Sequence, residues 1–339
     1  MPTVQTGTEH KMALEEGARG LEDIENLLLR ITHDFKVSFA RKKTKSIYVS
    51  LYLLFGNWMT ATTVPIEDEV GDVLEKAMRQ EGRFVDEIAQ AVDIPLSRLR
   101  DALDYRSELT CAELGRLARV LQLNEVGLCA LGENSYPLPI CSGLPFVLHA
   151  LRMRHGVGVV NAYVISAVGA ERGILFDTGP NLAALLENWP PTIKGIDSVF
   201  LTHIEGEHTG GLCDVVDYFG IKSAFVPHGC HPPCGEAIGD AVEIKWANIK
   251  VQAFSTPGHA SAHNCYRISV ANPTGATALL IAGDLIFAGS VGGSYFSSQL
   301  HRKNLRRILN LCAADTILAP GHGPLTSVGN ELRYNPFLP

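Results

Sequence analysis

The sequence of 339 residues lacks the motifs that mark two large classes of enzyme. It has no Gly-x-x-x-x-Gly-Lys run, which argues against a nucleotide-phosphate loop, and no Gly-x-Ser-x-Gly elbow, which argues against a serine hydrolase. Internal repeats and low-complexity stretches are absent as well. A nucleophile derived from a metal-activated water is therefore favoured over a side-chain nucleophile.

Excess positive charge is also missing. The formal net charge is −7 and the isoelectric point is near 5.9, which argues against a general nucleic-acid binder. The eight cysteines are scattered without the spacing of a disulfide framework, so we expect a reducing, cytoplasmic environment. With 46% hydrophobic residues, a chain of this length is expected to form two domains.

Residues 1–65 are predicted to be an N-terminal extension. The first forty residues are polar and charged, so they do not resemble a secretory signal. The apolar run Ile47–Phe55 follows basic residues, but it is too short to span a bilayer and is interrupted at Gly56. We therefore expect a buried helix or strand and no membrane partner. Whether the natural product begins at Met59 is left open.

Residues 66–135 show helical periodicity. Apolar residues recur at spacings of three and four in "VGDVLEKAM", "VDEIAQAV", "LSRLRDALDY" and "AELGRLARVLQL". The run "DEIAQAVDIPLSRLRDAL", followed by "LARVLQL", resembles the helix-turn-helix domains of Cro and phage repressors. Pro95 suits the first turn of the predicted recognition helix, and Ser97 suits a cap.

The helix-turn-helix resemblance raises DNA as a partner. Arg98, Arg100 and Arg106 lie on or near the predicted recognition helix. Between Glu67 and Glu125, however, the sequence has fourteen acidic and eight basic residues. A net acidic domain repels the phosphates of the DNA backbone. The sequence favours a packing, dimerisation or substrate-lid role, and a homodimer is a further expectation.

Residues 161–322 alternate strand and helix patterns. Strands are expected at 161–166, 173–179, 198–203, 223–227, 242–246, 249–256, 265–270, 277–284 and 316–322. Helices are expected at 181–189, 210–220 and 298–311.

Metal-type ligands gather at the ends of several of these apolar runs. Four of them stand together in "FLTHIEGEHTGGL": His203, Glu205, Glu207 and His208. Three more follow singly in "STPGHASAH", "LLIAGDLIF" and "ILAPGHGP": His259, Asp284 and His322. One tetrahedral ion uses fewer ligands than this, so two ions are expected. A carboxylate has two oxygens with which to bridge them, and a water between them becomes a nucleophile near neutral pH.

The order of these motifs resembles the metallo-β-lactamase superfamily over residues 144–328. The resemblance implies an αββα sandwich, so the fold class is α+β with an N-terminal all-α helix-turn-helix-like domain. It further implies two groups of metal ligands, the first made of His203, Glu205 and His259 and the second of Glu207, His208 and His322.

The same resemblance implies roles for residues around these ligands. Asp284 would bridge the two ions, and Asp177 in "ILFDTG" would orient a ligand imidazole. Gly210 and Gly211 would let the backbone approach the site closely. Glu207, Asp284 and Asp177 are the residues expected to act in catalysis, the first two by taking up or returning a proton.

The sequence departs from the usual His-x-His-x-Asp-His pattern of these hydrolases. Glu205 replaces a histidine and Glu207 replaces an aspartate. A carboxylate at the first position shifts preference from zinc towards iron or manganese, and it resembles flavodiiron proteins. No flavodoxin-like half is recognisable, so such chemistry would need a separate electron donor protein. The run "GDLIFAGSVGGSYF" resembles glyoxalase II-like hydrolases, but Gly293 replaces a common arginine, which argues against glutathione thioesters.

Two weaker candidates remain beside the main cluster. His263 is expected to have a structural or solvated role, with the lining of a substrate pocket as its alternative. The run "PHGCHPPCGE" admits a small metal knuckle, although an ordinary loop beside the site is favoured because a second cysteine pair is missing. The residues of that run are His228, Cys230, His231 and Cys234.

The preferred function is hydrolysis of a small-molecule ester, thioester, amide or phosphoester by a dinuclear centre. Two divalent ions per chain are expected, zinc or iron, with manganese as a further alternative. Di-iron chemistry on oxygen or nitric oxide remains open, as does a metal-responsive DNA-binding regulator.

Overall fold

The computed structural model describes residues 64–156, 158–232, 234–270 and 277–339. The apolar run Ile47–Phe55 and the question of a start at Met59 lie outside these residues. Within the described part of the chain, no helix is long and apolar enough to cross a membrane.

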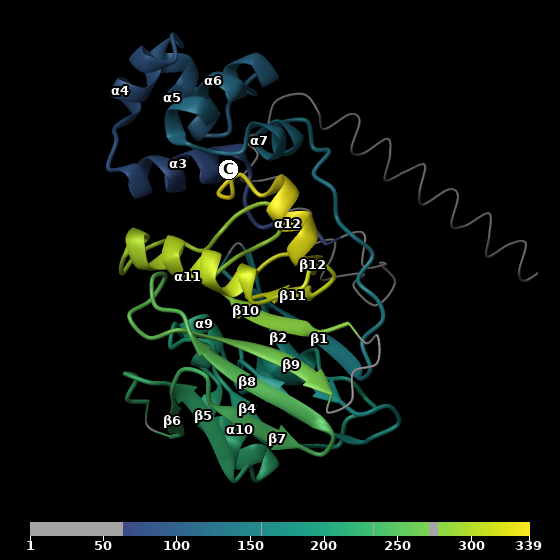
Figure 1. The fold of residues 1–339 in the computed structure, drawn as a ribbon. Coiled ribbons are helices and arrows are strands. Elements are labelled where there is room, and N and C mark those ends of the chain that lie inside the picture. Colours follow the sequence, from purple (N-terminus) through teal and green to yellow (C-terminus); the bar gives the residue numbers. More distant parts are fainter. Residues whose placement is uncertain (1–63, 157, 233, 271–276) are drawn as a thin grey trace, which may run out of the picture. The chain divides into compact units, whose positions relative to one another are not determined.

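Five helices follow one another in the N-terminal part of the described chain (Figure 1). They are α3 (Val70–Glu81), α4 (Val85–Ala91), α5 (Leu96–Leu103), α6 (Cys111–Leu121) and α7 (Glu125–Gly132). The first four match the expected helical segments, and α7 is an addition. Their apolar stripes meet in one core, where Val73, Ile88 and Leu128 are fully buried. The likeness to a repressor-type helix-turn-helix stays a prediction.

The start of α5 differs from expectation. Pro95 has an extended backbone, with φ −52° and ψ 132°, and is the residue that precedes the helix. Its carbonyl accepts the first hydrogen bond, from the Leu99 amide at 3.0 Å. The prediction that Ser97 caps this helix is wrong, because Ser97 already lies inside the first turn and Pro95 occupies the cap position.

Two of the three arginines considered for DNA contact are engaged within the chain. Arg98 forms two contacts with the Glu113 carboxylate, Nε to Oε1 at 2.5 Å and an Nη nitrogen to Oε2 at 2.8 Å. Arg106 pairs with Asp101 and Asp104, each at 2.8 Å. Arg100 is exposed. The basic charge on this face is therefore largely neutralised by neighbouring carboxylates.

We expect Glu113→Gln to lower the thermal midpoint slightly at pH 7 and to have less effect as the pH falls. The Arg98 hydrogen bond holds the pKa of Glu113 at about 2, below its ordinary 4.5. An acid with a lowered pKa stabilises the fold above its ordinary pKa, and this contribution is lost as the pH falls towards the folded-state value. Glutamine keeps an acceptor for the Thr110 amide while removing the charge.

The experiment compares thermal midpoints of wild type and variant from pH 7 to pH 3. Exposed Glu75→Gln is the matched control and should stay near wild type. A deficit that is the same at all pH values would contradict the ion-pair explanation.

The remaining chain forms two six-stranded sheets (Figure 1). The first has the order β1-β2-β3-β4-β5-β6. Its strands are β1 (Val147–His155), β2 (Gly158–Ser166), β3 (Arg172–Phe176), β4 (Gly195–Phe200), β5 (Ser223–Pro227) and β6 (Glu236–Ile238). The second has the order β12-β11-β10-β9-β8-β7. Its strands are β7 (Glu243–Trp246), β8 (Ile249–Ser255), β9 (Asn264–Val270), β10 (Leu279–Gly283), β11 (Ile317–Pro320) and β12 (Thr326–Ser327).

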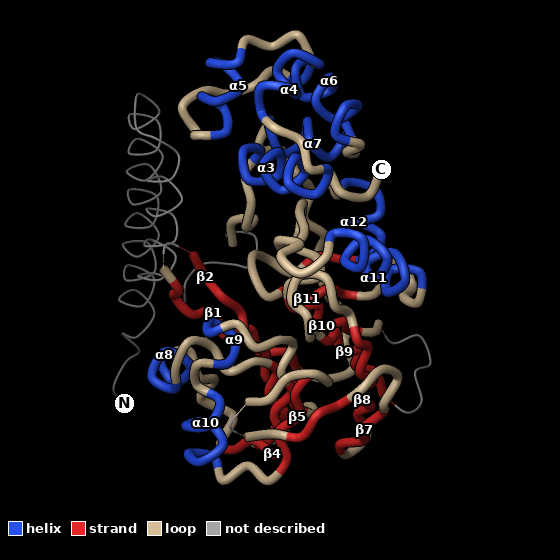
Figure 2. Tube along the Cα trace, turned by 90° about the vertical axis from the view of Figure 1, so that its left-hand side faces the viewer, coloured by secondary structure: helices blue, strands red, loops and turns tan. Residues whose placement is uncertain are grey.

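Helices cover the outer faces of both sheets (Figure 2). The short helices α8 (Leu182–Glu187) and α10 (Leu212–Phe219) share one buried cluster with the first sheet. The long helix α11 (Ser298–Asn310) packs Leu305 and Ile308 against the second sheet. Between the sheets, Phe176, Phe200 and Tyr266 pack with ring centroids 5.1–5.6 Å apart. The predicted αββα sandwich is confirmed.

The strands expected from apolar runs are all present, whereas β1, β6 and β12 were not expected. In β1, "VLHALRMRH", charged and polar residues interrupt the apolar ones, and the strand is only partly buried. It forms a regular antiparallel ladder with β2 over its whole length. Backbone pairing, rather than burial of its own side chains, decides that this segment is a strand.

Hydrogen bonds from α7 and α3, among others, join the helical part to the C-terminal part of the chain. The Asn124 amide before α7 donates to Pro336 O at 2.7 Å, beyond α12 (Val328–Tyr334). From α3, Lys76 Nζ donates to Val291 O at 2.7 Å and Gln80 Nε2 to Ser294 Oγ at 3.2 Å. Helix α3 therefore supports the loop between β10 and α11.

Candidate metal centre

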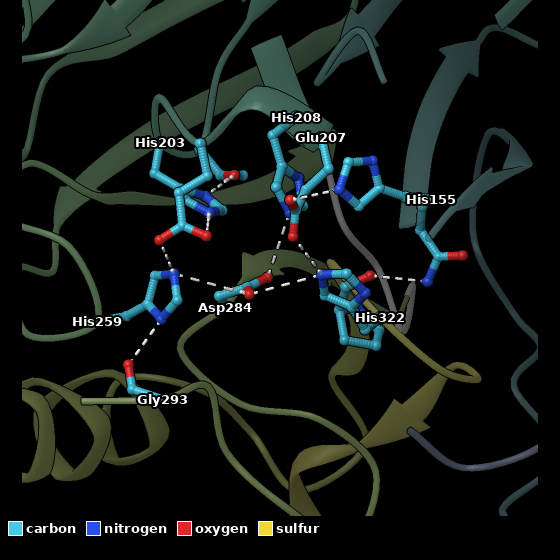
Figure 3. Close-up of polar contacts among 12 residues, drawn as sticks. His155, His203, Glu207, His208, His259, Asp284, Gly293 and His322 are labelled. Atoms are coloured by element: carbon cyan, nitrogen blue, oxygen red, sulfur yellow. Dashed lines mark hydrogen bonds and ion pairs between the residues drawn. The ribbon is translucent and has the colours of Figure 1, made fainter. Parts of the chain in front are cut away.

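The predicted ligands lie at one edge of the sandwich, where several strands end (Figure 3). Asp177 follows β3 and the His203–His208 segment follows β4, and these two strands are parallel neighbours. Asp284 follows β10, and His322 comes shortly after its parallel neighbour β11. Because parallel strands end at the same edge, the fold gathers residues that are far apart in the sequence.

Seven side chains form three overlapping groups in which the ligand atoms lie within 4.8 Å of one another. The groups are His203, Glu205 and His259; His203, His208 and Asp284; and Glu207, His208 and His322. The first and third are the two ligand sets expected from the sequence. The structure thus brings all seven predicted ligands together.

Asp284 lies in the middle of the cluster, as Figure 3 shows. Its Oδ1 is 3.6 Å from His208 Nε2, and its Oδ2 is 3.7 Å from His259 Nε2 and 3.6 Å from His322 Nε2. One carboxylate therefore faces both expected ligand sets.

Three atoms at this centre are buried without a hydrogen-bond partner among the described residues: His203 Nε2, His208 Nε2 and Asp284 Oδ1. A fourth buried atom, His259 Nε2, contacts Glu205 Oε1 at 2.9 Å. A buried polar atom without a partner costs about 1–3 kcal/mol, so a concentration of them in a native fold needs an explanation. Metal coordination would satisfy the three partnerless atoms, and the residues fit a pair of metal ions.

The other ring nitrogen of each of three histidines is held by an acceptor. Nδ1 of His259 donates to Gly293 O at 2.7 Å, and Nδ1 of His322 donates to Val159 O at 2.9 Å. His203 Nδ1 lies 2.9 Å from Thr202 Oγ1. A proton on Nδ1 leaves the Nε2 lone pair free, so these contacts select the tautomer that binds metal.

Asp177 orients the fourth histidine. Its Oδ2 lies 3.1 Å from His208 Nδ1 and 2.8 Å from Thr202 Oγ1, while Oδ1 accepts from the Thr202 amide at 2.7 Å. The backbone of Asp177 is left-handed, with φ 59°, a conformation that aspartate tolerates better than most residues. Asp177 therefore reaches two ligand histidines, His208 directly and His203 through Thr202.

Charges at the centre perturb its pKa values. Burial by itself would raise the pKa of Asp284, but His322, His208 and other imidazoles hold it far below its usual range. Burial would lower the pKa of His208, but the hydrogen bond and charge of Asp177 raise it to about 9. Metal ions bind the unprotonated form of an imidazole nitrogen, so metal binding at this centre is expected to release protons.

The glycines after the ligand segment permit the close approach expected of them. A Cβ on Gly210 would lie 2.1 Å from Pro180 O, closer than any side chain allows. The Thr178 amide donates to His208 O at 2.8 Å, so the segment after β3 is fastened to the ligand turn. A larger residue at Gly210 would separate these segments.

His263 has the structural role that the sequence favoured. It is buried, its Nδ1 lies 2.7 Å from Thr256 Oγ1, and its Nε2 accepts from the Asp284 amide at 3.1 Å. The imidazole therefore holds the backbone of the central carboxylate. It belongs to none of the three ligand groups.

The metal-knuckle alternative is not supported. Among the described residues, none of the ligand groups contains His228, Cys230, His231 or Cys234. The described residues of the run between β5 and β6, namely 228–232, 234 and 235, lie in neither a helix nor a strand, as the sequence favoured.

His155 was not recognised from the sequence. It lies at the end of β1, is about half exposed, and places Nε2 3.2 Å from Glu207 Oε2 (Figure 3). The other oxygen of Glu207 lies 3.7 Å from His322 Nε2. The sequence contained only an indirect signal for His155. Glu207 is one methylene longer than the aspartate usual at its position, so its carboxylate reaches further and needs an additional partner.

We expect His155→Ala to weaken metal binding about 10-fold, as is usual when a partner of a ligand is removed. Without the imidazole, the Glu207 carboxylate loses the contact that directs its other oxygen towards His322. The measurement is a chelator competition titration. His155→Gln, which keeps a donor, should bind more tightly than the alanine variant.

Exposed His231→Ala is the matched control and should bind as wild type. Equal affinity of His155→Ala and wild type would show that Glu207 needs no such support.

Known proteins resemble this chain over the sandwich. The model of the metallo-beta-lactamase superfamily matches residues 155–322. A hydroxyacylglutathione hydrolase of Salmonella dublin is 27% identical over 158 residues, which cover 44% of this chain and 57% of that protein. The chain thus spans little more than half the length of this relative. An uncharacterized protein of Aquifex aeolicus is 25% identical over 205 residues, covering 52% of this chain and 91% of that protein.

Among solved structures, a metallo-beta-lactamase from Staphylococcus aureus subsp. aureus COL has a TM-score of 0.49 and 20% identity. The match covers 58% of this chain and 63% of that one. The superfamily match, the two-sheet sandwich and the ordered ligands at its strand ends lead to one conclusion. Residues 155–322 form a domain of the metallo-beta-lactamase superfamily.

Proposed function

We propose that this protein is a metal-dependent hydrolase of an ester, thioester, amide or phosphoester. The observation that carries the proposal is the convergence of buried imidazoles on the Asp284 carboxylate, where His203 Nε2, His208 Nε2 and Asp284 Oδ1 have no hydrogen-bond partner among the described residues. When bound, two metal ions would lower the pKa of a water and polarise the scissile carbonyl or phosphoryl group.

The residues divide into three roles. His203, Glu205 and His259 would hold the first ion, and Glu207, His208 and His322 the second. Asp284 would contact both, because each of its oxygens faces a different imidazole.

The substrate would approach from the side of the two glutamates. The side chains of Glu205 and Glu207 are 37% and 23% exposed, whereas those of His203, His208 and Asp284 are buried. Imidazoles and Asp284 thus form the floor of the site, and the glutamates form its open face. Thioester hydrolysis gains support from the hydroxyacylglutathione hydrolase relative, within the half of that protein's length that the match spans.

A second candidate is di-iron chemistry on oxygen or nitric oxide. It is favoured by the place of Glu205, whose Oε1 lies 2.9 Å from His259 Nε2 within the first ligand group. A carboxylate ligand suits iron or manganese better than zinc. An electron donor protein would then be the required partner.

For the helical part, a packing role is proposed in preference to DNA binding. Arg98 and Arg106 already have carboxylate partners, and the region is net acidic. Phosphate contacts need free cations, which this face supplies poorly.

The deciding experiment is elemental analysis of protein purified without added metal, with an absorption spectrum. Two zinc ions per chain and turnover of chromogenic esters or thioesters without reductant would support the hydrolase. Two irons per chain, with a near-ultraviolet band that dithionite bleaches, would instead support the oxygen chemistry. Protein that neither contains metal nor takes it up would overturn both.

A further inference from the structure

We propose that Cys213 and Cys234 form a dithiol that hydrogen peroxide converts to a disulfide. Cys213 is the second residue of α10, and Cys234 lies between β5 and β6. Their Sγ atoms are 2.8 Å apart. A disulfide bond is about 2.05 Å long, so a movement of less than roughly 1 Å would bring the sulfurs to bonding distance.

All eight cysteines are free thiols within the described residues. Two pairs of them are hydrogen-bonded through their side chains, Cys213 with Cys234 and Cys111 with Cys129. Only the first pair borders the metal centre. Cys213 and Cys234 are both half-buried, which leaves them accessible to a small oxidant. Cys265, by contrast, is fully buried against Thr256 and the Ala282 carbonyl.

The reaction has two balanced steps. Burial and the hydrogen bond with Cys213 raise the pKa of Cys234 to about 12, so Cys234 stays a thiol at neutral pH. The Cys213 sulfur then attacks one oxygen of the peroxide, and the O–O bond breaks to give a sulfenic acid and one water. The Cys234 thiol displaces the sulfenic hydroxyl, which leaves as a second water. Two thiols lose two electrons and two protons in total.

The cross-link would join two segments that border the metal centre. Helix α10 begins directly after the ligand turn that contains His208. The loop between β5 and β6, which contains Cys234, also contains Gly229. A Cβ built on Gly229 would lie 3.8 Å from the side chain of Ala262, which lies between His259 and His263 in the sequence. The dithiol thus links the helix after one ligand segment to the loop that packs on another.

The test is peptide mapping of the full chain after peroxide treatment and alkylation of the remaining thiols. Trypsin cleaves after Lys194, Lys222 and Lys245, so each cysteine of the pair falls in a separate peptide. We expect peptides 195–222 and 223–245 to be joined, with a loss of two hydrogens, and to separate on reduction. The thermal midpoint should rise by roughly 5 °C on oxidation.

Peptide 223–245 also contains Cys230, so Cys230→Ser is the matched control. It should keep the cross-link, whereas Cys213→Ser and Cys234→Ser should each lose it. Sulfonic acid at Cys213 without a joined peptide would overturn the proposal. Persistence of the joined peptide in Cys234→Ser would overturn it equally, by assigning the bond to Cys230.

Discussion

We expect Asp284→Asn to lower metal affinity more than about 100-fold. Removing a residue that only hydrogen-bonds to a metal ligand typically lowers the affinity roughly 10–100-fold, and Asp284 is expected to be a ligand itself. Turnover of any hydrolysed substrate should fall with the affinity. The carboxylate is buried, and its two oxygens face imidazoles of both ligand sets. An amide presents one oxygen and one NH₂ group, and the NH₂ group cannot act as a ligand.

The measurement is metal content per chain after dialysis against a weak chelator, together with chromogenic ester turnover. Asp315→Asn is the matched control, because Asp315 is exposed in the same domain. Full metal content in Asp284→Asn would show that Asp284 is not the residue shared by the two ions. Circular dichroism should stay near wild type, which separates loss of metal from loss of fold.

Gly321→Ala is expected to weaken metal binding as well, although no ligand is replaced. A Cβ at this position would lie 2.2 Å from Asp284 Oδ1 and 2.9 Å from His208 Cε1. Either the carboxylate or the end of β11 must move, at a cost of about 1–3 kcal/mol typical of overpacking. We therefore expect metal affinity to fall at least roughly 10-fold, since ligand geometry depends on sub-ångström placement.

Gly206→Ala is a demanding control, because Gly206 lies between Glu205 and Glu207 in the ligand motif itself. A Cβ there would meet nothing within 4 Å, so metal content and stability should remain near wild type. Chelator titrations of the two variants in parallel test the steric argument. If both lose metal equally, the cause would be the backbone flexibility of glycine rather than the space around Asp284.

Much of the sandwich could be predicted because its strands and helices have strong local patterns. Strands β4 and β10 are apolar runs that end in ligands, and α11 alternates buried and charged positions. The prediction that Ser97 caps α5 failed because proline and serine both suit a helix start. Only the backbone geometry at Pro95 distinguishes them. Strand β1 was not expected because its ladder partner, rather than its own composition, makes it a strand.

The sequence by itself determined which residues could act as metal ligands and their order along the chain. These residues come directly after apolar runs, and apolar runs of this length form strands, so the ligands lie at strand ends. Tertiary structure alone decided what each ligand touches. The contacts of His155 with Glu207 and of Cys213 with Cys234 join segments that carry no shared local signal. The pairing of Arg98 with Glu113 depends on how α5 packs against α6. Such contacts depend on the packing of distant segments, which periodicity and spacing along the chain do not encode.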